Sequence, residues 1–217
     1  MSNSDRLAAR LKTAKGRTTS QQNWLRRHIN DPYVGKAKDA GYRSRAAFKL
    51  IEIDAKARIF RNGIKVVDLG AAPGGWTQVM IERNAGMVVA LDILEMDPIP
   101  GAIMLHADFL DPKAADRVKA ALNGPADLIL SDMAPSMTGH RETDHLRIIT
   151  LVEAAFDFAC EVLKPGGAFV AKLRQGGEEQ KLVKAVQGRF AKLQRIKPPA
   201  SRAESAEFYF AATGFKG

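Results

Sequence analysis

The chain has 217 residues, of which 46% are hydrophobic, and a formal net charge of +9. This length suits one α/β domain with at most a small appendage, and the hydrophobic content excludes global disorder. No apolar run approaches the roughly 18 residues of a membrane helix, and the single cysteine, Cys160, excludes an internal disulfide framework. We expect a cytoplasmic protein with no membrane partner and a monomer as the default; the mitochondrial matrix is the less favoured location.

The positive charge lies near the N-terminus. Residues 1–49 hold 12 Lys+Arg against 3 Asp+Glu, and basic and acidic residues balance over the rest of the chain. We predict a basic, flexible arm over residues 1–30, followed by one domain over residues 31–217. Such an arm is typical of proteins that bind a polyanion, because contact releases the counterions held by the polyanion.

Aromatic residues among these charges, Trp24, Tyr33 and Tyr42, favour RNA as that polyanion because unpaired bases stack on aromatic rings. Two other interpretations stay open. The arm could be a solvated tail with no partner, as charged runs often are. It could also be a transit peptide, since residues 6–22 contain Arg, Ser and Thr but no acidic residue.

The first predicted helix of the domain runs from Ser44 to Arg58. Ser44 is a candidate N-cap, because a serine hydroxyl can accept a hydrogen bond from a free amide of the first turn. Phe48, Leu50 and Ile51 are expected on the apolar side of this helix.

Segment 64–76 is the most informative stretch of the chain. A β-branched run ends in Asp68, small residues including Gly70 and Gly74 follow at once, and a helical pattern begins at Trp76. This order of strand, small-residue turn and helix forms a nucleotide-shaped crevice at the carboxyl end of the first strand of an α/β sheet. The loop alone is equally compatible with an ordinary strand-turn-helix of a Rossmann-like domain.

The glycine spacing distinguishes between possible ligands of that crevice. The run Gly70-x-x-x-Gly74-Gly75 lacks the G-x-G-x-x-G pattern that cradles a pyrophosphate. Asp92 ends the next predicted strand, 22 residues after Gly70, where an acidic residue is expected to accept hydrogen bonds from ribose hydroxyls. An adenosyl ligand without a pyrophosphate therefore fits better than NAD, and S-adenosylmethionine is the common ligand of that description.

Strand and helix patterns then alternate to the C-terminus. Strands are predicted over 64–69, 86–92, 102–106, 126–131, 167–173, 190–197 and 206–213. Helices are predicted over 75–84, 112–122, 144–163 and 178–188, with a helix stop and turn at 164–167. The alternation predicts an α/β fold with a mainly parallel sheet and helices on both faces. The last two strands are too close for a helical crossover, so we expect a C-terminal antiparallel hairpin and a seven-stranded Rossmann-like sheet.

Four polar residues lie at unexpected places in these elements. Asp132 and Lys172 follow or end two predicted parallel strands, at the edge where open α/β sheets bind ligands. Glu207 opens the last strand, which an antiparallel direction brings back to the same edge, and Lys49 interrupts the apolar pattern of the first helix. Each residue alone could be a cap or a solvated lysine. Together, beside the predicted adenosyl pocket, they indicate an active site.

These residues suit methyl transfer to a weakly acidic hydroxyl, which needs placement in line with the sulfonium and removal of the acceptor's proton. A neutral lysine can remove that proton, although an ordinary lysine has a pKa near 10.4, so discharging it at pH 7.5 costs about 4 kcal/mol. We predict Lys172 as the base and Lys49 as the neighbouring cation that eases its discharge. Neighbouring carboxylates, here Asp132 and Glu207, raise the pKa of a lysine instead. Whether the pKa of Lys172 is raised or lowered overall therefore stays open.

Four segments of the chain closely resemble the FtsJ/RrmJ (RlmE) family, ribosomal RNA large-subunit methyltransferases that act on the 2′-oxygen of a uridine in 23S rRNA. They are residues 43–50 (RSRAAFKL), 67–76 (VDLGAAPGGW), 131–135 (SDMAP) and 201–209 (SRAESAEFY). The similarity runs from about Asp31 to the C-terminus with matched order and spacing, and residues 1–30 have no part in it.

The resemblance implies roles for individual residues. Lys49, Asp132, Lys172 and Glu207 correspond to the catalytic set of the family, with Lys172 as the proton acceptor. The contacts to S-adenosylmethionine that it implies come from Gly74, Trp76, Asp92, Asp108 and Asp132; Asp108 would accept the adenine amino group and Asp92 the ribose hydroxyls. The implied partner is large-subunit rRNA, either free or within the assembled 50S subunit.

One position departs from the family pattern. After Lys172 the family usually has an apolar or aromatic residue before Gln-Gly, whereas this chain has Leu173-Arg174-Gln175. Arg174 is expected either to contact a phosphate or to be simply exposed.

Two alternatives remain beside this interpretation. The chain could methylate the 2′-oxygen of another RNA, such as small-subunit rRNA, tRNA or an mRNA cap, or it could be a non-catalytic ribosome-assembly factor that binds RNA.

The histidines do not predict a metal site, because His140 and His145 are five residues apart and no third ligand type clusters with them. Residues 136–145 are predicted to form a mobile loop over the pocket.

Overall fold

The structure is a computed structural model and describes residues 18, 22, 25–26, 28–135, 139–176 and 179–217. Most of the predicted arm over residues 1–30, Trp24 included, lies outside the described residues, and its boundary and role stay predictions. Residues 136–138 of the predicted pocket loop also lie outside them.

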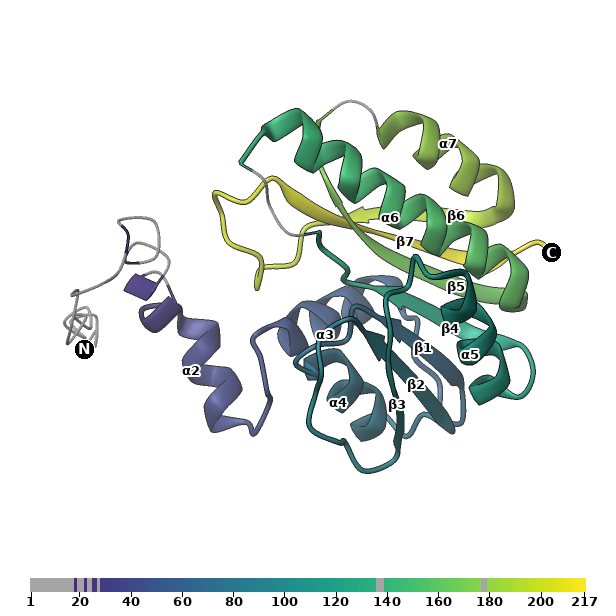
Figure 1. Cartoon of the computed structure of the whole chain (residues 1–217), viewed down its shortest axis with the longest axis horizontal. Coiled ribbons are helices and arrows are strands. Elements are labelled where there is room, and N and C mark those ends of the chain that lie inside the picture. Colours follow the sequence, from purple (N-terminus) through teal and green to yellow (C-terminus); the bar gives the residue numbers. More distant parts are fainter. Residues whose placement is uncertain (1–17, 19–21, 23–24, 27, 136–138, 177–178) are drawn as a thin grey trace.

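The order of helices and strands follows the predicted alternation (Figure 1). The strands are β1 (Lys65–Leu69), β2 (Met87–Asp92), β3 (Ala102–His106), β4 (Ala126–Ser131), β5 (Leu163–Arg174), β6 (Phe190–Ile196) and β7 (Glu207–Phe215). The helices are α2 (Pro32–Asp39), α3 (Ala46–Ala57), α4 (Gly75–Glu82), α5 (Pro112–Leu122), α6 (Arg141–Val162) and α7 (Glu179–Arg189).

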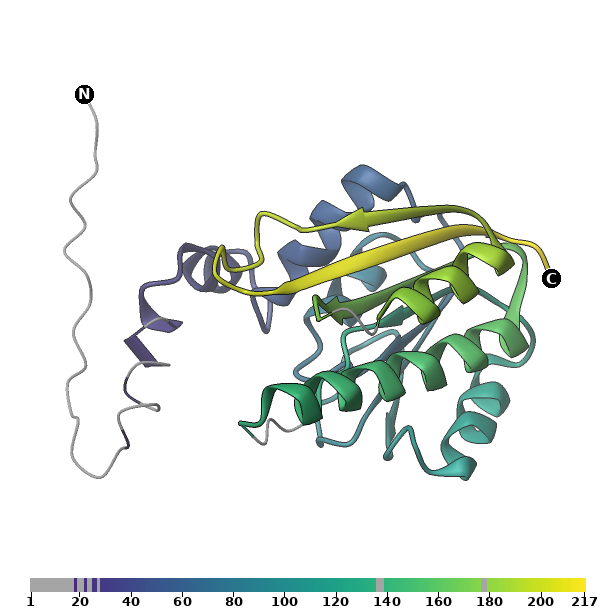
Figure 2. The same ribbon diagram turned by 90° about the horizontal axis from the view of Figure 1, so that it is seen from above.

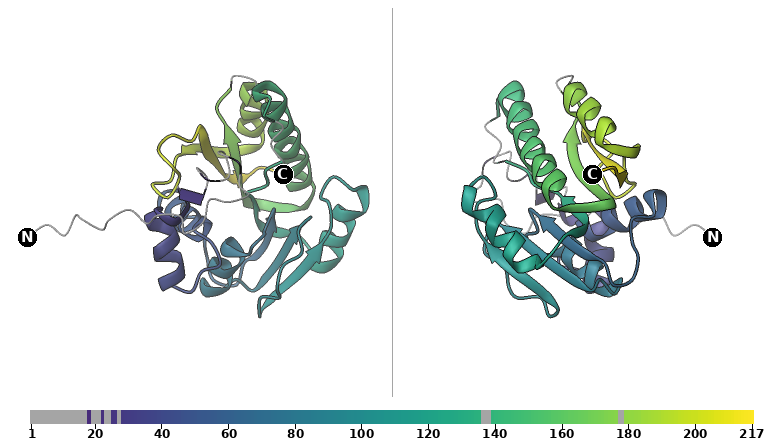
Figure 3. Two further views of the ribbon diagram at one scale, coloured as in Figure 1. Left: turned by 60° about the vertical axis from the view of Figure 1, so that its left-hand side comes forward. Right: turned by 90° about the vertical axis from the view of Figure 1, so that its right-hand side faces the viewer.

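All seven strands form one sheet in the order β3-β2-β1-β4-β5-β7-β6. The first five in sequence pair in parallel, and β7 lies between β5 and β6, antiparallel to both. Helices cover both faces of the sheet, with α3 and α4 on one side and α6 and α7 on the other (Figures 2 and 3). The predicted fold class, including the C-terminal antiparallel hairpin, is therefore confirmed.

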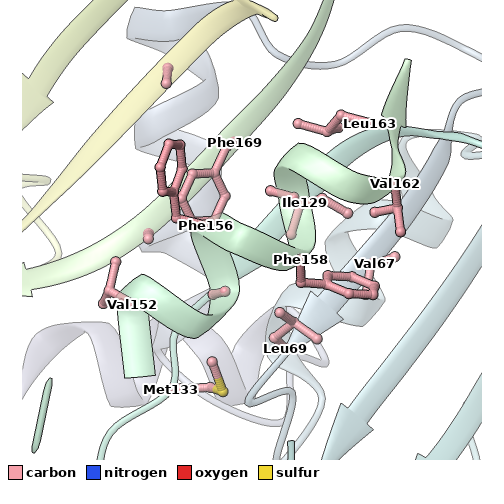
Figure 4. Packing of buried hydrophobic residues seen from close by; sticks show 14 of the residues in the cluster. Val67, Leu69, Ile129, Met133, Val152, Phe156, Phe158, Val162, Leu163 and Phe169 are labelled. Atoms are coloured by element: carbon pink, nitrogen blue, oxygen red, sulfur yellow. The ribbon is translucent and has the colours of Figure 1, made fainter. Parts of the chain in front are cut away.

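Each face of the sheet has its own hydrophobic core. On one face Phe169 of β5 stacks on Phe156 of α6, with ring centroids 6.1 Å apart, among aliphatic side chains from β1 and β4 (Figure 4). On the other face Leu50 and Ile53 of α3 pack with Trp76 of α4. Because side chains alternate between faces along a strand, this division decides which residues of β5 and β7 can meet α3.

Local signals explain why several elements begin where they do. Helix α5 has the predicted bounds: Pro112 occupies its first turn, and the side chain of Asp111 accepts a hydrogen bond from the amide of Lys113. Its C-cap residue, Asn123, adopts the left-handed conformation that ends many helices.

The structure corrects four details of the sequence interpretation. Helix α3 begins at Ala46 with Arg45 as its N-cap, so Ser44 lies one residue before the cap, although its hydroxyl accepts from the Ala46 amide. The fully buried side of α3 consists of Ala47, Leu50 and Ile53, because these positions fall on one face at helical spacing.

Phe48 is only partly buried and packs between the rings of Tyr33 and Tyr42 instead, and Ile51 is also only partly buried. Residues 164–167 are the irregular first part of β5 rather than a turn before it: Ala126 pairs with Leu163 and Leu128 already pairs with Ala168. Helix α6 begins at Arg141, so residues 141–145 are helical and not part of a loop. Among the described residues, no helix is long and apolar enough to cross a membrane.

Candidate active site

The loop between β1 and α4 brings the backbone close to the segment that follows β4. Gly70 has a φ of +76°, and a Cβ atom at this position would lie 2.7 Å from backbone atoms of Met133. Gly74, the N-cap of α4, has a φ of +107°. Only glycine adopts such conformations without strain, so the two glycines permit the tight turn that the sequence predicted.

A cavity of about 630 Å³ opens at this carboxyl edge of the sheet. Asp92 and Asp108 line it from the ends of β2 and β3, Gly70 from the β1–α4 loop and Met133 from the segment after β4. The remaining wall comes from α6, with Leu146 and Thr150 among its residues. The volume is within the range of about 300–1,000 Å³ typical of small-molecule sites.

Local backbone amides hold the two cavity carboxylates in place. Asp92 accepts hydrogen bonds from the amides of Ala72 and Leu94, both at 2.8 Å, and Asp108 accepts from the amide of Leu110 at 3.0 Å. A carboxylate has about four acceptor positions, so both groups retain the capacity to accept bonds from a ligand.

Beside the cavity lies a cluster of five side chains, hereafter the lysine cluster: Lys49, Asp132, Lys172, Glu207 and Tyr209. The ammonium nitrogen of Lys49 donates to the Tyr209 hydroxyl at 3.0 Å, and that hydroxyl donates to Asp132 Oδ1 at 2.8 Å. Lys172 Nζ lies 2.9 Å from the same carboxylate oxygen and donates to the Asp132 carbonyl oxygen at 2.6 Å. Glu207 completes the cluster with an ion pair of 3.6 Å to Lys49.

The charges of the cluster support one another. Burial raises the pKa of Asp132, but Lys172 and Lys49 together with the Tyr209 hydroxyl outweigh burial, so its pKa is lowered overall. Burial raises the pKa of Tyr209 well above its ordinary value, and the charge of Asp132 raises it further. Asp132 is therefore a carboxylate and Tyr209 a neutral hydroxyl at neutral pH, which makes Tyr209 a donor to Asp132.

The structure thus brings together all four residues of the predicted catalytic set, from α3, β5, β7 and the segment after β4. Asp132 connects this cluster to the cavity, because the next residue, Met133, lines the cavity wall. The lysine cluster and the cavity therefore share one edge of the sheet.

The predicted cofactor contacts fall in three places: the cavity, the start of α4 and the lysine cluster. Asp92 and Asp108 line the cavity, whereas Gly74, Trp76 and Asp132 do not. The Trp76 side chain is 2% exposed, and its indole nitrogen donates to the carbonyl oxygen of Ala46 at 2.7 Å. The amide of Gly74 donates to the carbonyl oxygen of Ala71 at 2.6 Å, and its carbonyl oxygen accepts from the amide of Gln78 at 2.9 Å. Of these two residues, the backbone amide of Trp76 remains for a ligand, because it lies in the first turn of α4, where amides lack partners within the helix.

Tyr209 is the residue of the cluster that the sequence analysis missed. It is fully buried, and its hydroxyl links Lys49 to Asp132 by accepting a hydrogen bond from the first and donating one to the second. The strand period could have identified it: Tyr209 is two residues beyond Glu207, and alternate residues of a strand share a face, which places Tyr209 on the face of the predicted catalytic set.

Residues 42–215 match the model of a family described as FtsJ-like methyltransferase. The chain belongs to that family. The matched range contains both the residues that line the cavity and those of the lysine cluster.

Relatives of this FtsJ-like methyltransferase share more than half of its residues. A protein of Gluconobacter oxydans named ribosomal RNA large subunit methyltransferase E is 55% identical over 95% of this chain and 77% of its own length. A protein of the same name from Paramagnetospirillum magneticum is 57% identical over 97% of this chain and 89% of its own length.

Solved structures also resemble the FtsJ-like methyltransferase. A putative ribosomal RNA methyltransferase from Plasmodium falciparum has a TM-score of 0.73 and 28% identity, covering 81% of this chain and 100% of its own. A putative hemolysin from Streptococcus thermophilus has a TM-score of 0.58 at 17% identity over 80% of this chain and 67% of its own, which shows a shared fold only.

Proposed function

We propose that this methyltransferase transfers the methyl group of S-adenosylmethionine to the ribose 2′-hydroxyl of a uridine in large-subunit (23S) ribosomal RNA, with Lys172 as the general base. The observation that supports it best is the Lys49–Tyr209–Asp132–Lys172 hydrogen-bonded series beside a cavity lined by two carboxylates. The relatives named as large-subunit rRNA methyltransferases support the choice of substrate.

The residues of the cavity fit an adenosyl group. Asp92 would accept the ribose hydroxyls and Asp108 the adenine amino group, because both carboxylates have acceptor positions beyond those used by backbone amides. The N-terminal end of α4, at Gly74 and Trp76, would bind the carboxylate of the methionine part. When bound, S-adenosylmethionine supplies an electrophilic methyl group on a sulfonium.

Asp132 would hold Lys172 in the orientation that a base needs. A neutral lysine amine has two N–H donors and one lone pair. Two acceptors of Asp132, its carbonyl oxygen and its carboxylate, lie within hydrogen-bond distance of Lys172 Nζ, which leaves the lone pair for a third direction. A 2′-hydroxyl placed in that direction would give its proton to Lys172 while its oxygen takes the methyl group; the bond between methyl carbon and sulfur would break, leaving a neutral thioether.

Lys49 would act on the same hydroxyl from the α3 side, with Glu207 and Tyr209 fixing its position. Residues 1–30, with their excess of Lys and Arg, would bind the RNA backbone and raise the local concentration of substrate. We expect a monomer in the cytoplasm, with either free rRNA or the assembled 50S subunit as the acceptor.

The test is a methyl-transfer assay with purified protein, S-adenosylmethionine labelled in its methyl group, and large-subunit rRNA from a strain without this gene, either free or as 50S subunits. We expect label on one ribose 2′-oxygen, located by resistance of the adjacent bond to alkaline cleavage. Label on a base, on small-subunit rRNA or on tRNA would contradict the proposal. RNA binding without any label transfer would favour an assembly factor.

A further inference from the structure

The guanidinium of Arg174 is unusual among the arginines of this edge. Arg174 is the last residue of β5 and partly buried. Within the described part of the chain, the Arg174 side chain makes no hydrogen bond and no ion pair. Its five N–H donors therefore have no partner among the described residues and are available to a ligand.

The neighbouring arginines all have partners. Arg45 pairs with Asp31 and Arg202 pairs with the same carboxylate. Arg43 donates to the carbonyl oxygens of Pro73, Asp97 and Pro98. Arg195 donates to Gln175 and lies 3.8 Å from the ring centroid of Phe208. Those four have structural partners, whereas the Arg174 side chain has none within the described ranges.

Strand alternation places Arg174 on the same face of the sheet as the general base. Ala168 and Val170 of β5 belong to the core under α3, whereas Phe169, Ala171 and Leu173 belong to the core on the other face. Lys172 and Arg174 continue the first series, so their Cα atoms are about 6.7 Å apart along the strand and their side chains lie on one side.

The register of β7 gives the same placement. Lys172 pairs with Tyr209 and Arg174 pairs with Glu207 across the two strands. Glu207 is engaged by Lys49 and makes no ion pair with Arg174 within 4 Å. Arg174 is thus a cation at the outer side of the lysine cluster, two residues beyond Lys172 at the end of β5.

We propose that Arg174 binds an RNA phosphate next to the target ribose and so positions the 2′-hydroxyl against Lys172. The inference rests on the proposed function, since it assigns the substrate contact that places the acceptor. In RNA the 2′-hydroxyl and the 3′-phosphodiester are attached to neighbouring ribose carbons, so a hydroxyl at Lys172 has a phosphate nearby. The planar guanidinium matches two phosphate oxygens at once, which fixes orientation as well as distance.

Three variants test this role, each in the full chain. Arg174→Met removes the charge and keeps much of the length, Arg174→Lys keeps the charge without the fork, and Lys184→Met removes an exposed cation of α7 as a control of equal charge. Their affinity for deproteinised large-subunit rRNA from a strain without this gene is measured by filter binding across KCl concentrations. Methyl transfer gives KM and kcat, and calorimetry gives the affinity for S-adenosylmethionine.

Arg174→Met should raise KM for the rRNA about tenfold, with a smaller change in kcat, and lower the slope of log affinity against log salt by about 0.7 to 1. Arg174→Lys should restore the slope and part of the affinity. Lys184→Met and the cofactor affinity of all variants should match the wild type. An unchanged KM and slope in Arg174→Met, or an Arg174→Lys variant that behaves like Arg174→Met, would overturn the inference.

The binding measurement also separates this inference from the proposed function. Filter binding requires no chemistry, so Arg174 can prove to be a phosphate contact even if the wild-type protein transfers no methyl group to a 2′-oxygen. Conversely, methyl transfer to a 2′-oxygen with normal rRNA binding by Arg174→Met would leave the proposed function intact and overturn this inference alone.

Discussion

The two halves of the carboxyl edge of the sheet are built in different ways. In the cavity half, Asp92 and Asp108 each accept from the amide two residues further along the chain, so local backbone fixes both carboxylates. In the lysine cluster, Lys49 and Tyr209 are 160 residues apart and Tyr209 and Asp132 are 77 apart. Local turns thus hold the two carboxylates of the cavity half, whereas the cluster depends on the insertion of β7 beside β5. A change in one half should therefore leave the other largely intact.

The largest effect is expected from Lys172→Ala in the cluster. Loss of the base should lower kcat for methyl transfer at least 10²- to 10⁴-fold, the usual contribution of general base catalysis. Lys172→Arg should be equally inactive, because arginine keeps its charge at any usable pH and cannot accept the proton. Calorimetry should give wild-type affinity for S-adenosylmethionine in both variants. Substantial turnover by Lys172→Arg would mean that the lysine acts only as a cation.

The converse change in the cavity is Asp92→Ala. Removal of the ribose acceptor and of the bonds to Ala72 and Leu94 should weaken S-adenosylmethionine binding roughly 10- to 100-fold, since hydrogen bonds to charged groups contribute about 1.5–3 kcal/mol. At saturating cofactor, kcat should recover most of its wild-type value because the lysine cluster is untouched. Asp111→Ala is the matched control: it removes a carboxylate that accepts an amide two residues on but lies outside the cavity. Equal losses in the two variants would count against a cofactor role for Asp92.

A smaller effect is expected from Tyr209→Phe, which breaks the link between Lys49 and Asp132. The buried ring is kept while the hydroxyl is lost, so kcat should fall about tenfold, from the loss of hydrogen bonds to charged groups. Cofactor affinity should not change. Tyr42→Phe serves as the control, because the Tyr42 hydroxyl bonds to Glu82 on the exposed side of α4. Wild-type kcat in Tyr209→Phe would show that the lysines hold their places without the hydroxyl.

The smallest effect on activity, and a distinct one on stability, is expected from Asp68→Asn. Asp68 is fully buried in β1 between the two halves, and its carboxylate accepts from the Thr77 hydroxyl at 2.7 Å. Burial raises the pKa of Asp68 from 3.8 to about 7. The hydrogen bond from Thr77 lowers this pKa, and the charges of Asp132 and Asp92 raise it.

An acid whose pKa is raised in the folded state binds its proton more tightly there, so the free energy of unfolding falls as pH rises through this window. The loss is at most about 4 kcal/mol, at about 1.4 kcal/mol for each pH unit between 3.8 and about 7. Urea unfolding at pH 5 and pH 8 should therefore differ less in Asp68→Asn than in the wild type. Thr77→Val, which removes the opposing bond, should extend the loss to higher pH. An identical pH dependence in Asp68→Asn would rule out a buried, proton-binding Asp68.

The sequence by itself determined the order and type of the elements and the locally built half of the site. Alternating apolar runs of strand and helix length indicate a parallel α/β sheet. The loop glycines and the acidic residues at strand ends can be recognised because they directly follow or end predicted strands. Four of the five residues of the lysine cluster were also identified, since polar groups in apolar elements require an explanation.

Only the tertiary structure decided how those residues connect. In the sequence Tyr209 is one aromatic residue of a buried strand. Its role appears only when β7 pairs between β5 and β6 and brings the Tyr209 hydroxyl to Lys49 and Asp132. The same holds for Trp76, whose indole nitrogen bonds to Ala46, and for Arg174, whose side chain has no partner among the residues that the structure describes. Side-chain contacts over 77 or 160 residues depend on strand order and register, which local periodicity does not encode.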